Sequence, residues 1–156
     1  MKLSTPSFSA FLLPALAQLA AAESFSLYAY GDSLGGLALY YADGKAVVSA
    51  SIPSNATDVS RVTFTKEDSN GLLGNPPNDN HTTGDSGSLA NQLLYVPSSS
   101  ATSKQVGLTA DAGADQVTSR FVWYGNSLLV EDESGEYTSL FSVKKSSSDD
   151  GEYALL

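Results

Sequence analysis

The chain has 156 residues, of which 42% are hydrophobic and 16% are charged. This length and apolar content suit one folded domain, and they exclude a large multidomain enzyme and a wholly disordered chain. The net charge of −9, from 17 acidic and 8 basic side chains, argues against nucleic acid or an anionic membrane as a partner, because both bind basic surfaces. The absence of cysteine excludes a disulfide framework, and the single histidine excludes a site built on two imidazoles.

Residues 1–22 have the pattern of a secretory signal peptide. Lys2 supplies a positive start, an apolar run follows over 11–19, and Ala20-Ala21-Ala22 fits the small-x-small cleavage rule. The run is too short to span a bilayer, and the alternative is a buried N-terminal helix. We therefore expect a signal-peptide helix over 1–22, then a single secreted domain over 23–156.

From residue 23 onward, short apolar or alternating segments recur between turn-forming clusters, which predicts an all-β fold of about ten to twelve short antiparallel strands. The dipeptides Asp43-Gly44 and Gly125-Asn126 favour tight hairpins. No segment keeps a helical period with caps, so almost no helix is expected. The expected strands cover 25–30, 37–41, 46–50, 61–65, 93–96, 105–109, 121–124, 127–130, 137–143 and 153–156.

A weak threefold repeat groups these strands. The groups begin near Gly36, Leu93 and Ser127, and each closes on a strand that contains an aromatic residue. Threefold repetition predicts a trefoil-like closed barrel. The groups differ in length, so a two-sheet β-sandwich is the alternative. The polar stretch 68–91 is expected to be a long loop, which in a compact domain is either functional or disordered.

Gly31-Asp32-Ser33-Leu34 resembles the block that names the GDSL esterases and lipases. That resemblance implies Ser33 as nucleophile, on a fold of alternating strands and helices, with a histidine base preceded by aspartate three residues earlier. Here the one histidine is His81, Asn78 stands three residues before it, and a hairpin is expected after Leu34. We therefore expect a Gly-Asp-Ser turn between two strands. A small secreted serine esterase that uses Ser33 and His81 is the alternative.

Gly84-Asp85-Ser86-Gly87 resembles the nucleophile block of chymotrypsin-like serine proteases. The family's histidine and aspartate lie far upstream of the serine, whereas His81 precedes Ser86 by only five residues. The block is better explained as loop chemistry, and no catalytic residue is expected.

Two acidic groups could supply oxygen ligands to a cation. One is Asp79, Asn80 and Asp85, and the other is Glu131-Asp132-Glu133 with Glu136. Neither has the fixed spacing of a calcium loop, and the second is typical of a solvated face. No metal and no cofactor are therefore expected.

Tyrosines supply the better binding candidates. Tyr28 and Tyr30 alternate with Phe25 and Leu27, and Tyr40 alternates with its leucine neighbours, so all three are expected to face outward or to line a cavity. Phe25, Phe64, Phe121 and Trp123 are instead expected in the core. Tyrosine pairs an apolar ring with a polar tip, which suits a sugar. The alternative is ordinary cross-strand pairing of tyrosines as good strand formers.

Two sequons, Asn55-Ala56-Thr57 and Asn80-His81-Thr82, lie in expected loops and predict N-glycosylation at Asn55 and Asn80. The blocks 25–31, 35–37, 41–46, 121–125 and 153–156 resemble small secreted proteins of filamentous ascomycete fungi, a largely uncharacterised group described as cell-wall-like or effector-like. The resemblance implies an extracellular fungal protein and carries no catalytic residues. We therefore expect a secreted, non-enzymatic extracellular or cell-wall protein that binds a wall polysaccharide, or alternatively an effector that binds a host protein.

Overall fold

The computed structural model describes residues 23–32, 34–77, 82–83, 88–132, 134–139, 141–146 and 151–156, with only the backbone described at 82–83. The expected signal peptide at 1–22 lies outside these residues. The described part of the chain is all-β, with 50% strand and no helix, and the sequence predicts this class. The part that the structure describes contains no helix able to cross a bilayer.

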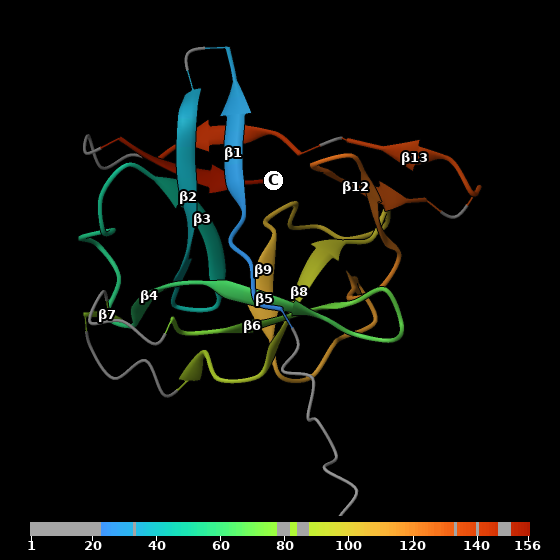
Figure 1. Cartoon of the computed structure of the whole chain (residues 1–156), viewed down its shortest axis with the longest axis horizontal. Helices are drawn as coiled ribbons and strands as arrows, with labels where there is room; N and C mark the ends of the chain where they lie inside the picture. The colour runs from blue at the N-terminus through green and yellow to red at the C-terminus, as the bar shows by residue number, and fades with distance from the viewer. Residues whose placement is uncertain are drawn as a thin grey trace, which may run out of the picture.

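Two antiparallel sheets form the fold (Figure 1). The larger follows the order β5-β6-β8-β9-β3-β2-β4-β7, with β1 added on β2, β10 on β8, and β15 joining β14 to β3. It curves into a half-barrel. The smaller sheet has the order β11-β12-β13. The strands are β1 (Tyr28–Gly31), β2 (Leu34–Ala42), β3 (Lys45–Ser49), β4 (Val59–Arg61), β5 (Thr63–Lys66), β6 (Leu72–Asn75), β7 (Thr82–Thr83), β8 (Gln92–Pro97), β9 (Gly107–Thr109), β10 (Gln116–Val117), β11 (Phe121–Tyr124), β12 (Ser127–Glu131), β13 (Tyr137–Thr138), β14 (Val143–Lys145) and β15 (Glu152–Leu155).

The two predicted tight hairpins are confirmed. Asp43 and Gly44 join β2 to β3 with φ angles of 48° and 83°, the left-handed conformation that such a turn requires. Gly125 joins β11 to β12 with a φ of 60°. The local sequence alone therefore sets these two strand registers.

The curvature of the large sheet comes from β4 and β5, which are separated by one residue. β4 pairs with β2, whereas β5 pairs with β6. Between them, the Val62 amide donates to the Leu39 carbonyl at 3.4 Å. One stretch of chain therefore contacts two parts of the sheet, and the concave side holds the core. Its fully buried members include Phe64, Leu72, Leu89, Leu94 and Val106.

The second half of β2 is buried on both faces. Leu39 and Tyr41 belong to the main core, while Tyr40 packs with Ala38 and Val59 in a second cluster on the opposite face. Tyr40 is only 5% exposed. Tyr40 does lie on the face opposite Leu39, as the alternation predicts, but the expectation that it faces outward is wrong, because the side chains of Val59 on β4 and Ala56 in the preceding loop pack against that face.

Two other sequence expectations are corrected. The stretch 68–91 is not simply a loop, because it contains β6, which lies between β5 and β8 and contributes the buried Leu72. The stretch 137–143 is not one strand, because its ends belong to β13 and β14 in different sheets.

The threefold repeat does not correspond to three equivalent units. Its second and third groups each divide their strands between the half-barrel and the small sheet. Neither the closed trefoil-like barrel nor the signal peptide is confirmed.

Candidate functional site

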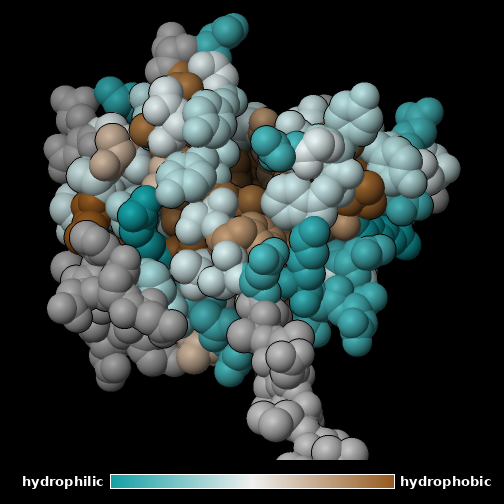
Figure 2. Space-filling view, in the orientation of Figure 1, coloured by the Kyte–Doolittle hydropathy of each residue, from teal (hydrophilic) through white to brown (hydrophobic). Residues whose placement is uncertain are grey.

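A cleft of about 650 Å³, which we call the aromatic cleft, lies between β1 and the small sheet. Figure 2 shows apolar side chains gathered in a hollow between the β1–β2 hairpin and β12, with more polar residues around it. Its walls carry Tyr28, Tyr30 and Trp123, and its floor includes Leu27, Leu39, Leu128, Phe141 and Leu155.

Strand alternation builds the β1 wall. Leu27 and Ala29 pack against the main core on the side of the cleft floor, whereas Tyr28 and Tyr30 lie on the other face of β1, at the rim of the cleft, with exposed fractions of 47% and 77%. On that face the Tyr28 hydroxyl accepts a hydrogen bond from the Arg61 guanidinium at 3.5 Å. The pairing of β1 with β2 shifts register between Ala29 and Tyr30, and Gly36 is the extra residue of this bulge. The bulge re-aims the Tyr30 side chain relative to its neighbours.

Trp123 forms the opposite wall on β11. Phe25 contacts its ring edge-to-face, with centroids 5.2 Å apart, and the Lys66 ammonium lies 5.1 Å from its centroid on a different element. Phe25 in turn stacks on the buried Phe64. These two neighbours contact the indole from different elements and set its position at the cleft.

Polar groups lie at the ends of the two hairpins that flank the cleft. Asp32 follows β1, while Asn126 and Ser127 belong to the β11–β12 turn, and all three are exposed. The cleft therefore combines aromatic faces with carboxylate, amide and hydroxyl groups, which is the usual composition of a small-ligand site.

Two of the three predicted tyrosines thus meet at the cleft, and Tyr40 does not. Trp123, which the strand pattern assigns to the core, is half-buried at the cleft instead, while Phe64 and Phe121 are buried as predicted. The neighbouring Gly125-Asn126 turn was the available signal, because a side chain next to a hairpin end often lies at the rim of a sheet.

Only some residues of the two serine motifs lie in the described part of the chain. Asp32 lies in the turn between β1 and β2, and Leu34 begins β2, so the first motif sits on a strand-turn-strand unit. Ser33, His81 and Ser86 lie outside the described residues, and the distance between serine and base stays untested.

The acidic groups hold no metal site that the structure describes. Among the described residues, no cluster of three or more ligating side chains could bind a metal ion. The Asp132 carboxylate accepts hydrogen bonds from its own turn, from the Ser134 hydroxyl at 2.6 Å and from the amides of Ser134 and Glu136 at 2.8 and 3.0 Å. Asp79, Asn80, Asp85 and Glu133 lie outside the described residues.

Asn55 is exposed in the loop between β3 and β4, so its amide is accessible. Asn80 lies outside the described residues. Glycosylation at both positions stays a prediction.

Comparisons with protein families, with curated proteins and with solved structures return no match.

Proposed function

We propose that this protein is a secreted, non-enzymatic, cell-wall-associated or extracellular protein that binds a polysaccharide in the aromatic cleft. The single observation that carries the proposal is that Trp123 of the small sheet lines one hollow whose opposite rim carries the exposed Tyr28 and Tyr30 of the large sheet, together with polar groups.

The chemistry of a sugar fits this combination. The C–H faces of a pyranose ring stack on flat aromatic rings, while its hydroxyls require donors and acceptors at the edge. Tyr28 and Tyr30 supply phenolic oxygens next to their rings, and Asp32 and Asn126 add an acceptor and an amide.

The extracellular setting is supported by the signal-peptide pattern of 1–22, by the exposed Asn55 sequon and by the resemblance to small secreted fungal proteins. A wall polysaccharide is the partner that this setting would supply. The high acidic charge also agrees with a neutral polymer as the ligand rather than an anionic one.

The test is sedimentation of the purified protein with insoluble chitin, β-glucan and cellulose. We expect saturable binding to one polymer, weakened roughly two- to tenfold by Tyr28→Ala or Tyr30→Ala, because an aromatic contact contributes about 0.5–1.5 kcal/mol. Tyr124→Ala and Tyr137→Ala are matched controls, since both side chains are exposed and lie outside the cleft.

A second readout uses Trp123, which is the only tryptophan in the chain. Soluble oligosaccharides of the polymer that binds should change its fluorescence with the same saturation. Absence of sedimentation with all three polymers, or equal losses in the four tyrosine variants, would refute the proposal.

A further inference from the structure

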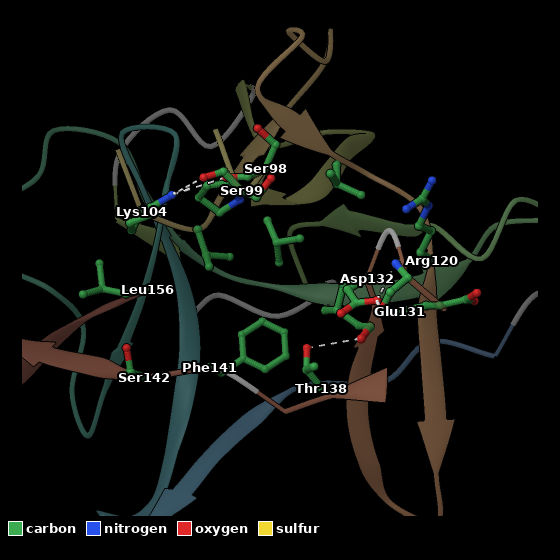
Figure 3. A pocket seen from close by; sticks show the side chains of 16 residues that line it. Ser98, Ser99, Lys104, Arg120, Glu131, Asp132, Thr138, Phe141, Ser142 and Leu156 are labelled. Carbon is green, nitrogen blue, oxygen red and sulfur yellow. Dashed lines mark hydrogen bonds between the residues drawn. The ribbon is translucent and has the colours of Figure 1, made fainter. Parts of the chain in front are cut away.

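A second cleft, of about 740 Å³, lies on the other side of Phe141 and Ser142, which line both hollows. We call it the apolar cleft. It lies between the β8–β10 pair and the small sheet, and Figure 3 shows Phe141 at its floor. The interior is formed by Val96, Val106, Val117, Val130, Phe141 and Leu156. Unlike the aromatic cleft, it presents no tyrosine or tryptophan.

The size and lining suit a small molecule with a long apolar part. Sites for such ligands commonly measure about 300–1,000 Å³ and are mostly apolar, with a few polar groups that orient the ligand. The cleft is lined by valine, phenylalanine and leucine side chains. An alkyl chain that displaces water from these side chains is stabilised by the hydrophobic effect.

Cationic groups lie at the rim. In Figure 3, Lys104 and Arg120 stand at opposite ends of the edge that carries Ser98 and Ser99. The Lys104 ammonium donates to the carbonyls of Ser99 at 3.1 Å and Ser98 at 3.5 Å. These two cations belong to a chain with only 8 basic side chains and a net charge of −9.

Arg120 is held in an unusual backbone conformation at this rim. Its φ is 71°, in the left-handed region that disfavours a side chain, and the Glu131 amide donates to its carbonyl at 3.0 Å. Its guanidinium makes no hydrogen bond or ion pair with any described residue, although Glu131 and Asp132 line the same cleft. The Asp132 carboxylate is already bonded within its own turn.

We propose that the apolar cleft binds a single alkyl chain with a carboxylate head, as in a free fatty acid. The chain lies along the valine-rich interior, and the carboxylate meets the guanidinium of Arg120 at the rim. A guanidinium is the cation best shaped to bind a carboxylate through two hydrogen bonds. The site is separate from the proposed polysaccharide site and does not depend on it.

The first test is calorimetric titration with octanoate, decanoate and dodecanoate below their critical micelle concentrations. Affinity should rise about fifteenfold for each added pair of methylenes, because each buried methylene contributes a factor of about four. Val117→Trp should weaken binding of the longest chain most, because the indole occupies part of the path along the interior, and Val117 is not among the residues packed against the core.

The matched control is Val122→Trp, on a half-buried position of β11 outside both clefts, which should bind as the unmodified protein does. If thermal unfolding shows that Val117→Trp does not fold, Val117→Phe replaces it with a smaller ring. Equal affinity for all three chain lengths, or unchanged binding in a folded Val117 variant, would overturn the proposal.

The second test addresses the head group. Arg120→Gln should weaken dodecanoate binding about three- to fivefold, as expected for an exposed ion pair, and leave 1-dodecanol binding unchanged. Lys144→Gln, a charge-matched change on β14 outside the cleft, should leave both ligands unaffected. An equal effect of the two charge changes would refute the role of Arg120.

Each of the two proposed sites can be refuted without refuting the other. Tyr30→Ala should not change dodecanoate affinity, and Val117→Trp should not change polysaccharide sedimentation. Loss of both activities in either variant would contradict separate sites.

Discussion

The aromatic ring of Tyr30 lies directly over Gly36. A Cβ at position 36 would stand 3.0 Å from Cε1 of Tyr30 and 3.1 Å from its hydroxyl oxygen, closer than side chains normally approach. Gly36 is also the extra residue of the β1–β2 bulge and has a φ of 74°. The absence of a side chain at this position therefore sets both the bulge and the placement of a cleft aromatic.

Replacing Gly36 with alanine should destabilise the protein by about 1–2 kcal/mol, because a non-glycine residue is strained in the left-handed region. The same change should move the Tyr30 ring and weaken polysaccharide binding as much as Tyr30→Ala does. Urea unfolding and sedimentation with the polymer measure the two effects separately.

Gly35→Ala is the matched control for this prediction. No atom lies within 4 Å of a Cβ at position 35, and its φ is outside the strained range. We expect the Gly35 variant to bind and unfold within about 0.5 kcal/mol of the parent. Equal effects at the two glycines would contradict the role given to Gly36.

The sequence predicted those parts of the fold that depend on neighbouring residues. The turn at Asp43-Gly44 is an example, because the left-handed conformation is a property of the dipeptide itself. The inward and outward faces of β1 follow equally from strand alternation, which is why Tyr28 and Tyr30 were placed correctly outside the core.

The parts that depend on distant segments were missed. β6 is short and lies in a polar stretch, and its stability comes from its neighbours β5 and β8. Tyr40 is buried because β4 covers it, and Trp123 borders a cleft because the small sheet docks beside β1. Local periodicity carries no information on such contacts.

A second glycine allows the close approach of β3 and β9, which are joined through the pair Lys45 and Gly107. A Cβ at Gly107 would overlap the carbonyl oxygen of Gly44 and stand 2.7 Å from the Tyr95 hydroxyl. Gly107→Ala should therefore force backbone movement and cost about 2–3 kcal/mol, lowering the melting temperature by roughly 5–10 °C.

Gly113→Ala is the comparison, since a Cβ there meets its nearest atom only at 3.8 Å. Thermal unfolding followed by circular dichroism should give it the same melting temperature as the parent within about 2 °C. A tolerated alanine at position 107 would show that the β3–β9 contact is looser than described.

The Asp132 turn should respond to acid. The hydrogen bond from the Ser134 hydroxyl, followed by that from the Glu136 amide, lowers the pKa of the Asp132 carboxyl below its usual value. A lowered pKa in the folded state means that the stabilising contribution is present above the pKa of the unfolded chain and is lost as pH falls through the folded one. The contribution should therefore disappear only in strong acid.

An NMR titration of the Asp132 carboxyl carbon measures this directly. Its midpoint should lie below the ordinary aspartate value, and Ser134→Ala should raise it, because the principal donor is then removed. Thr138→Ala, a hydroxyl loss on β13 away from the Asp132 carboxylate, should leave the midpoint unchanged. An unaltered midpoint in the Ser134 variant would assign the shift to the backbone donors alone.

The Gln105 side chain connects β3, β15 and the segment just before β9. Its Nε2 group faces the carbonyls of Ala46 at 3.0 Å, Val106 at 3.1 Å and Leu155 at 2.9 Å. Gln105→Glu keeps the shape but replaces a donor with a carboxylate that faces three acceptors. At neutral pH this change should cost about 1–3 kcal/mol, because the Gln105 donor is lost and a carboxylate then faces three carbonyl oxygens of like partial charge.

The pH dependence of that variant distinguishes this cause from simple misfit. The glutamate pKa should be raised, because only the protonated acid can donate to the carbonyls, so the lost stability should return as pH falls through that raised pKa and be regained in full below the unfolded value of about 4.3. Gln105→Met keeps the length without a donor and should remain destabilised at both pH values. Urea unfolding at pH 7 and pH 3 measures the difference, and recovery of neither variant in acid would refute the donor role of Gln105.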